Sequence, residues 1–404
     1  MRVLYLNATA ELGGAERSLL DIMASLRQAQ PSWELRLLCA DEGPLREQAS
    51  RLGVATDVLK FPRSLSRVGE AGVSPTMAGR LQLGARLALA ALPVAKYVDD
   101  LRGVMRRLRP DVVHTNSLKM HVVAAEARPD GASLVWHLHD YIGGRRLTVR
   151  LLRRQVARVS AIVTNSQSVA EDARAALGRA APVFAVYNAV DLHRFQPAGP
   201  RTDLDALSGL PAAASDVVRV GLIATFGRWK GHTTFLEAVS RLPADVHVRA
   251  YIIGGALYQT VGSQYSLDDL QRYAQRLGLG DRVGFTGFVA RPEDAMRALD
   301  IVVHASTAPE PFGLVIAEAM ACSRAVIASD AGGAREIFTS GVDGLPHTPG
   351  NEESLARRIA ELARDPDERL RLGRAGRLTA ERRFDRARLA TDLLPVYEHA
   401  MAHA

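Results

Sequence analysis

The sequence predicts an α/β protein built from two doubly wound, Rossmann-like domains, and three observations support this. The chain has 404 residues, which is enough for two or three domains. Both halves alternate short, nearly continuous apolar runs with longer helical patterns, as expected for parallel sheets covered by helices on both faces. A stretch rich in Pro, Gly, Ala and Ser separates the two halves at 194–216.

The predicted elements follow in order along the chain. The expected strands of the first half are 2–7, 34–39, 111–115, 133–138, 161–165 and 183–187, and those of the second half are 217–224, 246–253, 282–287, 300–305 and 325–329. We place the first domain at 1–197 and the second at 198–384. The segment 385–404 is expected to be a helix that returns to the first domain, kinked or divided at Pro395. Ligands of such folds bind at the carboxyl ends of the strands, here facing a cleft between the domains.

Composition points to a cytoplasmic globular protein. Hydrophobic residues make up 47% and charged residues 24% of the chain, as in soluble domains. Cys39 and Cys322 lie in opposite halves without metal-ligand spacing, so neither a disulfide scaffold nor a zinc site is expected. Asn7 and Glu11 interrupt the first residues too early for a signal peptide. The apolar tract at 87–95 is too short to span a bilayer.

Positive charge gathers in the first half. Residues 1–200 hold 27 Lys and Arg against 18 Asp and Glu, whereas residues 201–404 hold 24 against 26. In the segment 143–159, five arginines would fall within about 140° of a helix, with Val149, Leu152, Val156 and Val159 on the other side; they are Arg146, Arg150, Arg153, Arg154 and Arg158. Such a helix can lie on the anionic inner face of a membrane. An ordinary helix packed on the sheet is the alternative, and no nucleic acid is expected as a partner.

The stretch EPFGLVIAE at 310–318 is the most informative motif. Its Pro and Gly predict a loop at Glu310 and a helix that begins directly afterwards. The first amides of this helix, on Phe312, Gly313 and Leu314, would bind an anion. Glu310 could accept hydrogen bonds from hydroxyls beside that anion, and Glu318 lies about 10 Å further along the helix. A nucleotide-diphosphate sugar fits this spacing, whereas the structural alternative is a helix with two unrelated glutamates.

Two further stretches could contact a diphosphate. Gly13 and Gly14 follow a predicted strand and open a helix, where the missing side chains would let a phosphate approach the backbone. A plain tight turn is the alternative. Lys230 precedes Gly231 and another helical run, and it could balance the charge of a departing diphosphate, since no metal motif is visible. A solvated lysine at a helix entry is the alternative there.

Taken together, these motifs resemble the retaining GT-B glycosyltransferases of family 4, the glycosyl transferases group 1. The similar stretches are collinear over nearly the whole chain: GGAERSLLDIMASL (13–26), VYNAVDLHRF (186–195), FGRWKGHTTFLEAV (226–239), RVGFTGFV (282–289) and the 310–318 motif. The resemblance implies that Glu310 binds the sugar hydroxyls and Glu318 the ribose. It implies that the amides of Phe312, Gly313 and Leu314 hold the distal phosphate and sugar, and that the Gly13–Gly14 loop and Lys230 hold the diphosphate.

The chain departs from the family pattern at two places. Family members usually carry an Arg five or six residues before the Lys, and these two cations bind the diphosphate. Here Arg228 precedes Lys230 by only two residues. Arg228 therefore either reaches the phosphates from another position or leaves diphosphate binding to Lys230. The family's histidine that reaches the donor sugar matches His139. A second family histidine is replaced by Asn116, with His114 two residues earlier, and both are candidates for the acceptor side.

The sequence thus predicts a retaining, metal-independent glycosyltransferase with no cofactor beyond its nucleotide-sugar co-substrate. His139, Lys230 and Glu310 are the expected catalytic residues. The acceptor is left open among lipid-linked, polysaccharide and small-molecule glycan acceptors. Two other functions stay open at this point: a nucleotide-sugar epimerase or hydrolase of the same fold, and a sugar-nucleotide-binding protein without turnover.

Overall fold

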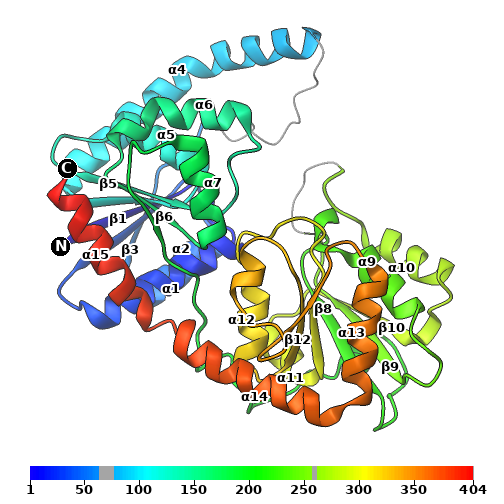
Figure 1. Ribbon diagram of the computed structural model, residues 1–404. Helices are drawn as coiled ribbons and strands as arrows, with labels where there is room; N and C mark the ends of the chain where they lie inside the picture. Colours follow the sequence, from blue (N-terminus) through cyan, green and yellow to red (C-terminus); the bar gives the residue numbers. More distant parts are fainter. Residues whose placement is uncertain (63–76, 257–261, 404) are drawn as a thin grey trace. The chain divides into compact units, whose positions relative to one another are not determined.

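The computed structural model describes residues 1–62, 77–256 and 262–403, and it divides the chain into two compact units (Figure 1). Unit 1 comprises Met1–Tyr187 and Arg386–Ala404, and unit 2 comprises Asn188–Asp385. The division after Tyr187 comes earlier than the limit expected after residue 197. The reason is that the Val190 amide donates to the Phe384 carbonyl at 2.7 Å, which ties this stretch to unit 2.

Unit 1 contains, among its described residues, a seven-stranded parallel sheet in the order β3-β2-β1-β4-β5-β6-β7. The strands are β1 (Arg2–Asn7), β2 (Glu34–Cys39), β3 (Ala55–Val58), β4 (Val112–Thr115), β5 (Ser133–Leu138), β6 (Ala161–Thr164) and β7 (Val183–Ala185). The sequence missed β3, because this edge strand is short and only partly buried.

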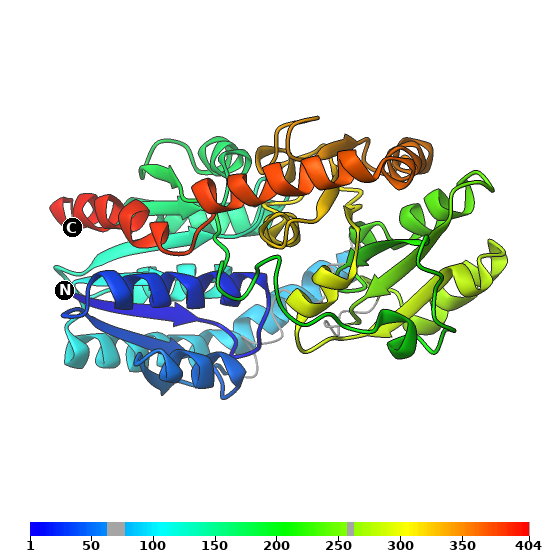
Figure 2. The ribbon, with the colours of Figure 1, turned by 90° about the horizontal axis from the view of Figure 1, so that it is seen from below.

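Helices cover both faces of this sheet. The helices of unit 1 are α1 (Gly14–Ala29), α2 (Pro44–Arg51), α4 (Met77–Leu108), α5 (Leu118–Ala127), α6 (Arg146–Gln155), α7 (Gln167–Leu177) and α15 (Arg388–Ala402). The apolar residues of α4–α7 form one core with the sheet. On the other face α15 packs on α1, where Ser25 donates to the Ala387 carbonyl and accepts from the Ala390 amide. Pro395 lies inside α15 without dividing it, and the end of α15 lies near the start of β1 in this unit (Figure 2).

Unit 2 contains, in the part that the structure describes, a six-stranded parallel sheet in the order β10-β9-β8-β11-β12-β13. The strands are β8 (Val218–Ile223), β9 (Val248–Ile253), β10 (Val283–Gly287), β11 (Ile301–His304), β12 (Ala325–Ser329) and β13 (Leu345–His347). The sequence missed β13, a three-residue strand that contains Pro346.

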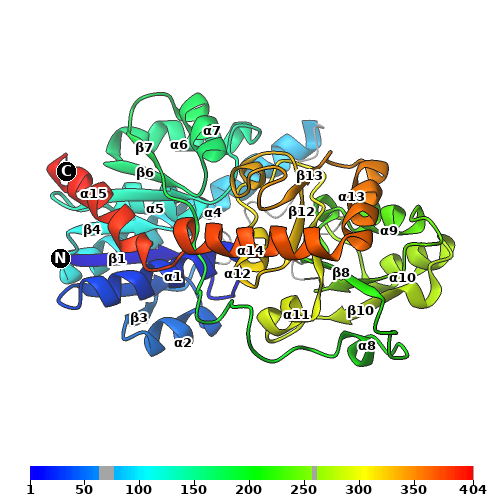
Figure 3. The ribbon, with the colours of Figure 1, turned by 60° about the horizontal axis from the view of Figure 1, so that its bottom comes forward.

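Two helical layers enclose this second sheet. The helices are α8 (Leu204–Leu207), α9 (His232–Ser240), α10 (Leu267–Arg276), α11 (Pro292–Ala298), α12 (Leu314–Ala321), α13 (Glu352–Arg364) and α14 (Pro366–Arg383). The apolar residues of α9, α10 and α13 share one core with the strands, and α12 packs on α14 (Figure 3). The predicted fold class, two doubly wound parallel sheets, is confirmed.

The strand order of each sheet predicts where a ligand would bind. The strand order reverses between β1 and β4 in unit 1, and between β8 and β11 in unit 2. Loops that leave neighbouring strands in opposite directions open a crevice at the carboxyl ends, which is where doubly wound sheets bind ligands. None of the helices in the described part of the chain has the length and apolar character needed to cross a membrane.

Candidate active site

A partly buried ion pair lies where the strand order of unit 2 reverses between β8 and β11, the switch point of this sheet. Lys230 ends a short 3₁₀ turn after β8, and Glu310 lies in the loop after β11. The Nζ atom of Lys230 donates to Oε1 of Glu310 at 2.7 Å and to Oε2 at 2.8 Å. The Lys230 and Glu310 side chains are only 23% and 13% exposed, so water screens this pair weakly. The structure therefore joins two predicted site residues that are far apart in the sequence.

A glycine makes this close approach of the two loops possible. Gly231 has a φ of +75°, and a Cβ atom there would lie 1.8 Å from the carbonyl oxygen of Ala305. Only glycine meets both demands, because it has no side chain and adopts positive φ freely. Next to it, the Thr307 amide donates to the Trp229 carbonyl at 2.8 Å. These contacts fix Lys230 over the end of β11.

Two side chains that the sequence analysis missed contact the Glu310 carboxylate. Ser306 Oγ donates to Oε2 at 2.7 Å, and His304 Nε2 lies 3.5 Å from the same oxygen. The Gly333 amide donates to the backbone carbonyl of Glu310 at 2.8 Å. Burial alone would raise the pKa of Glu310, but the His304 hydrogen bond and the charge of Lys230 outweigh it and hold this pKa well below its usual range. These two side chains could have been found in the sequence, because His304 and Ser306 are polar residues at the end of an apolar strand.

The helix of the 310–318 motif begins later than expected. Its first residue is Leu314, and Gly313 caps it in the left-handed conformation with a φ of +96°. Phe312 is buried and packs edge-to-face on Phe384, with ring centroids 5.8 Å apart. Glu318 lies in the second turn of α12 and is half-buried. The amides of Phe312 and Gly313 therefore belong to the turn that precedes the helix.

Arg228 and Lys230 have different partners in the structure. Arg228 Nε donates to the Gly262 carbonyl at 2.9 Å, and its guanidinium lies 4.5 Å from the centroid of the Tyr265 ring. The described contacts of Arg228 thus hold the loop before α10, whereas Lys230 serves Glu310.

The switch point of unit 1 carries the Gly13–Gly14 loop. The Gly13 amide donates to Glu16 Oε2 at 3.1 Å, so it is already occupied by a carboxylate. Gly14 opens α1 without a positive φ, and a Cβ atom there would meet nothing within 4 Å. Neither the backbone conformation nor internal packing requires a glycine at Gly14, which leaves its outer side open to a ligand.

Asn116 and His139 lie next to each other at the carboxyl ends of two neighbouring strands of this sheet. Asn116 follows β4, His139 follows β5, and His139 Nε2 lies 2.7 Å from Asn116 Oδ1. Asn165 Nδ2 donates to the His139 carbonyl at 3.2 Å, which fixes the backbone after the strand. Burial lowers the pKa of His139 to about 3, so its ring is neutral at physiological pH.

His114 does not reach the ligand side of unit 1, contrary to the expectation that it lines the acceptor. It is 0% exposed, with Nδ1 2.8 Å from the Tyr397 hydroxyl and Nε2 3.2 Å from His137 Nδ1. The reason is that α15 returns to cover this face of the sheet and brings Tyr397 against it. His114 therefore links the last helix to the core.

The basic segment 143–159 forms α6 and a short 3₁₀ turn. Leu152 and Val156, on its apolar side, are buried in the core of unit 1, so this side is not available to a membrane. That corrects the membrane arrangement expected from the sequence. The opposite side exposes Leu147 by 58% and Leu151 by 48%.

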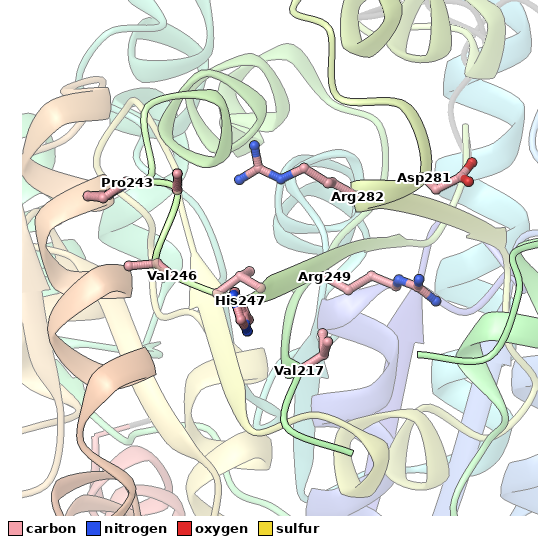
Figure 4. Close-up of a pocket in the computed structure, with 9 residues that line it drawn as sticks. Val217, Pro243, Val246, His247, Arg249, Asp281 and Arg282 are labelled. Atoms are coloured by element: carbon pink, nitrogen blue, oxygen red, sulfur yellow. The ribbon is translucent and has the colours of Figure 1, made fainter. Parts of the chain in front are cut away.

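A cavity of about 420 Å³ lies at the amino ends of the strands in unit 2 (Figure 4). It is lined from the starts of β8, β9 and β10, including Val217, Arg249 and Arg282. Arg249 donates to Asp205 Oδ1 at 2.7 Å and Arg282 to the Val239 carbonyl at 3.1 Å, so the fold itself uses both cations. This cavity is at the amino ends of the strands, away from the switch point.

The chain matches known proteins over nearly its full length. Residues 12–194 match the family model described as Glycosyltransferase Family 4, and residues 213–379 match Glycosyl transferases group 1. It is 32% identical over 310 residues to the D-inositol 3-phosphate glycosyltransferase 1 of Catenulispora acidiphila, covering 72% of each chain. The D-inositol 3-phosphate glycosyltransferase of Xylanimonas cellulosilytica is 32% identical over 253 residues, which is 61% of this chain and 58% of the relative.

A solved structure agrees with the fold. HepE of Anabaena, crystallised with UDP and glucose, is 28% identical and superposes with a TM-score of 0.79 over 98% of this chain and 99% of that one. Two doubly wound units of this kind make up the GT-B fold. The chain belongs to the glycosyl transferases group 1, glycosyltransferase family 4, whose members use nucleotide-sugar donors and retain the anomeric configuration. The family and the enzyme class predicted from the sequence are confirmed.

Proposed function

We propose that the protein transfers a sugar from a UDP-sugar to an acceptor hydroxyl, with the donor held mainly by unit 2. The Lys230–Glu310 pair is the main support for this proposal. It places a cation and a carboxylate that can accept hydrogen bonds from hydroxyls at one switch point. Lys230 would meet the diphosphate, Glu310 the sugar hydroxyls and Glu318 the ribose. Unit 1 would contribute the Gly14 amide and His139. UDP is chosen because HepE was crystallised with UDP and with UDP-glucose.

The residues suit the charges of such a reaction. The bond between the sugar C1 and the diphosphate oxygen breaks, and the acceptor oxygen bonds to C1 on the same face. The acceptor proton passes to the leaving diphosphate oxygen. Lys230 and the amides at the start of α12 would stabilise the charge that develops on the diphosphate. The depressed pKa of Glu310 keeps it ionised, so that it accepts hydrogen bonds from sugar hydroxyls.

Calorimetry with UDP and UDP-glucose tests the donor assignment. Glu310→Gln should weaken UDP-glucose binding by about tenfold or more, because the carboxylate that accepts from the sugar hydroxyls is lost. It should not weaken UDP binding, because UDP has no sugar at that position and Lys230 keeps its charge. Glu318→Ala should weaken both ligands, because both contain the ribose. Glu353→Gln, a surface change in unit 2, serves as the control. Unchanged UDP-glucose affinity in Glu310→Gln would contradict the assignment.

A product assay separates transfer from the other functions of this fold. UDP release that requires an added acceptor indicates transfer, whereas release in water alone indicates a hydrolase. Formation of a second UDP-sugar indicates an epimerase. Absence of any turnover, together with intact donor binding, would indicate a binding protein.

We further propose that the acceptor is lipid-linked and that α6 holds the enzyme against an anionic membrane. On its exposed side, three arginines spaced four residues apart run beside Leu147 and Leu151; they are Arg146, Arg150 and Arg154. These three have no ion-pair or hydrogen-bond partner among the described residues. Exposed leucines can enter the headgroup boundary while arginines bind phosphates, with roughly 1 kcal/mol for each basic residue.

A further inference from the structure

Glu16 is a buried carboxylate that the proposed reaction does not use. It lies in the first turn of α1 and is only 9% exposed. Each oxygen accepts a different hydrogen bond: Oε2 from the Gly13 amide at 3.1 Å and Oε1 from Asn7 Nδ2, also at 3.1 Å. A carboxylate in this turn also suits the helix dipole. The bond to Asn7 goes beyond such capping, because it connects the loop to the end of β1.

The orientations of the Asn7 and Asn116 side-chain amides follow from neighbours that can only accept hydrogen bonds. Asn7 Nδ2 also donates to the Thr9 carbonyl at 2.8 Å, so the amide nitrogen of Asn7 faces two acceptors. Its Oδ1 therefore faces Asn116, whose Nδ2 donates to it at 3.2 Å. Asn116 Nδ2 donates as well to the Ala15 carbonyl at 3.2 Å. That leaves Asn116 Oδ1 as the acceptor, and both amide orientations follow from the network.

The chain of bonds ends on His139 and determines its tautomer. Because Asn116 Oδ1 only accepts, His139 Nε2 must carry the hydrogen across the 2.7 Å contact. The neutral ring then has a bare Nδ1 atom, which has no hydrogen-bond partner among the residues that the structure describes. Burial, which lowers the pKa of His139, favours this neutral form.

We propose that Glu16 is a positioning residue that acts through Asn7 and Asn116 to hold His139 in the Nε2–H tautomer beside the Gly13–Gly14 loop. The inference rests on the proposed function, in which Gly14 and His139 both meet the donor. One rigid network would present both groups together, so that binding does not have to order them separately.

A double-mutant cycle measures whether the relay acts through His139. Asn7→Ala removes the middle link, and Glu16→Gln replaces an acceptor by a donor that faces the Gly13 amide or Asn7. Each change should lower kcat/KM by about fivefold or more in the wild type. In a His139→Ala background the same change should cost at least about threefold less. Glu11→Gln, an exposed glutamate in the same loop, should leave kcat/KM unchanged. If kcat/KM fell equally in the wild type and in the His139→Ala background, Glu16 would act only as a helix cap and the proposal would be overturned.

Imidazole ¹⁵N NMR decides the tautomer without reference to turnover. The His139 signal, identified by its loss in His139→Gln, should show a protonated Nε2 and a bare Nδ1 at neutral pH. An Nδ1–H ring or an imidazolium would overturn the relay. If His139→Ala keeps wild-type kcat/KM, the assigned role of His139 in the reaction fails instead, and the NMR result still decides the relay.

Discussion

The central residue-scale feature is that the opposite charges of Glu310 and Lys230 balance each other. An unpaired carboxylate in this position would repel a diphosphate, and an isolated buried ion is costly. The pair removes both problems, and Ser306 and His304 hold the carboxylate in place. Arg228, although only two residues away, is bonded elsewhere. Binding of the diphosphate by side chains is therefore expected to depend on a single cation, Lys230.

Lys230→Ala should lower kcat/KM by about 100-fold or more, because the charge on the leaving diphosphate loses its cation. It should also lower the free energy of unfolding by about 1–3 kcal/mol, because the Glu310 carboxylate loses its cationic partner. The pKa of Glu310 should rise, so activity should fall at a higher pH on the acid side than in the wild type. Steady-state kinetics over pH and urea unfolding measure these effects.

Arg228→Ala is the matched control, since it removes a neighbouring cation with other contacts. We expect kcat/KM within about threefold of the wild type. Comparable losses in the two variants would show instead that both cations serve the diphosphate.

At the scale of elements, α6 shows how one helix can satisfy two demands. Its buried side contributes Leu152 and Val156 to the core, while its outer side carries exposed leucines and three arginines that have no partner in the described part of the chain. Arg153 differs from these arginines because its Nε donates to the Ala176 carbonyl at 2.6 Å. A membrane-binding role would thus depend on the outer side alone.

Liposome co-sedimentation tests that role. Binding to vesicles of anionic lipid should decrease with added salt, and it should decrease several-fold when Leu147 and Leu151 are changed to Ser. Charge reversal of the three outer arginines to Glu should abolish it. The control changes the same number of exposed arginines elsewhere in unit 1 to Glu, namely Arg51, Arg106 and Arg179. Equal losses in both triple variants, or no binding at low salt, would contradict a dedicated surface on α6.

At the scale of the whole molecule, unit 1 buries a cluster of neutral histidines. Burial lowers the pKa of His114 and of His139 to about 3, and it lowers those of His121 and His137 as well. In the unfolded chain a histidine titrates near 6.5. Below that pH the unfolded state takes up protons that the folded state excludes, so stability is lost as the pH falls toward 3.

The thermal midpoint should therefore fall steadily as the pH is lowered from about 7 to 5. The free energy of unfolding should fall with a slope that approaches roughly 1.4 kcal/mol per pH unit for each buried histidine once the pH is below about 6. His114→Gln should make the dependence shallower, although it also removes the bond to Tyr397. His193→Gln, at an exposed position, should leave it unchanged. The explanation would be wrong if His114→Gln and the wild type had the same slope between these pH values.

The sequence by itself determined the alternation of strands and helices, the two-sheet fold class and the family. It could do so because those signals are local: apolar runs mark buried strands, and the 310–318 motif and the Gly13–Gly14 pair each lie within a few residues. It missed β3 and β13, whose short, partly polar stretches carry little apolar pattern.

Only the tertiary structure decided which side chains meet. Lys230 and Glu310 are 80 positions apart, and they pair because their strands are neighbours at a switch point. His114 is buried because Tyr397, 283 positions later, returns on α15. Which side of α6 is exposed depends on which side packs on the core. Such outcomes depend on contacts between distant segments, whose geometry is set when the sheets and helices pack, and a local pattern of residues does not contain it.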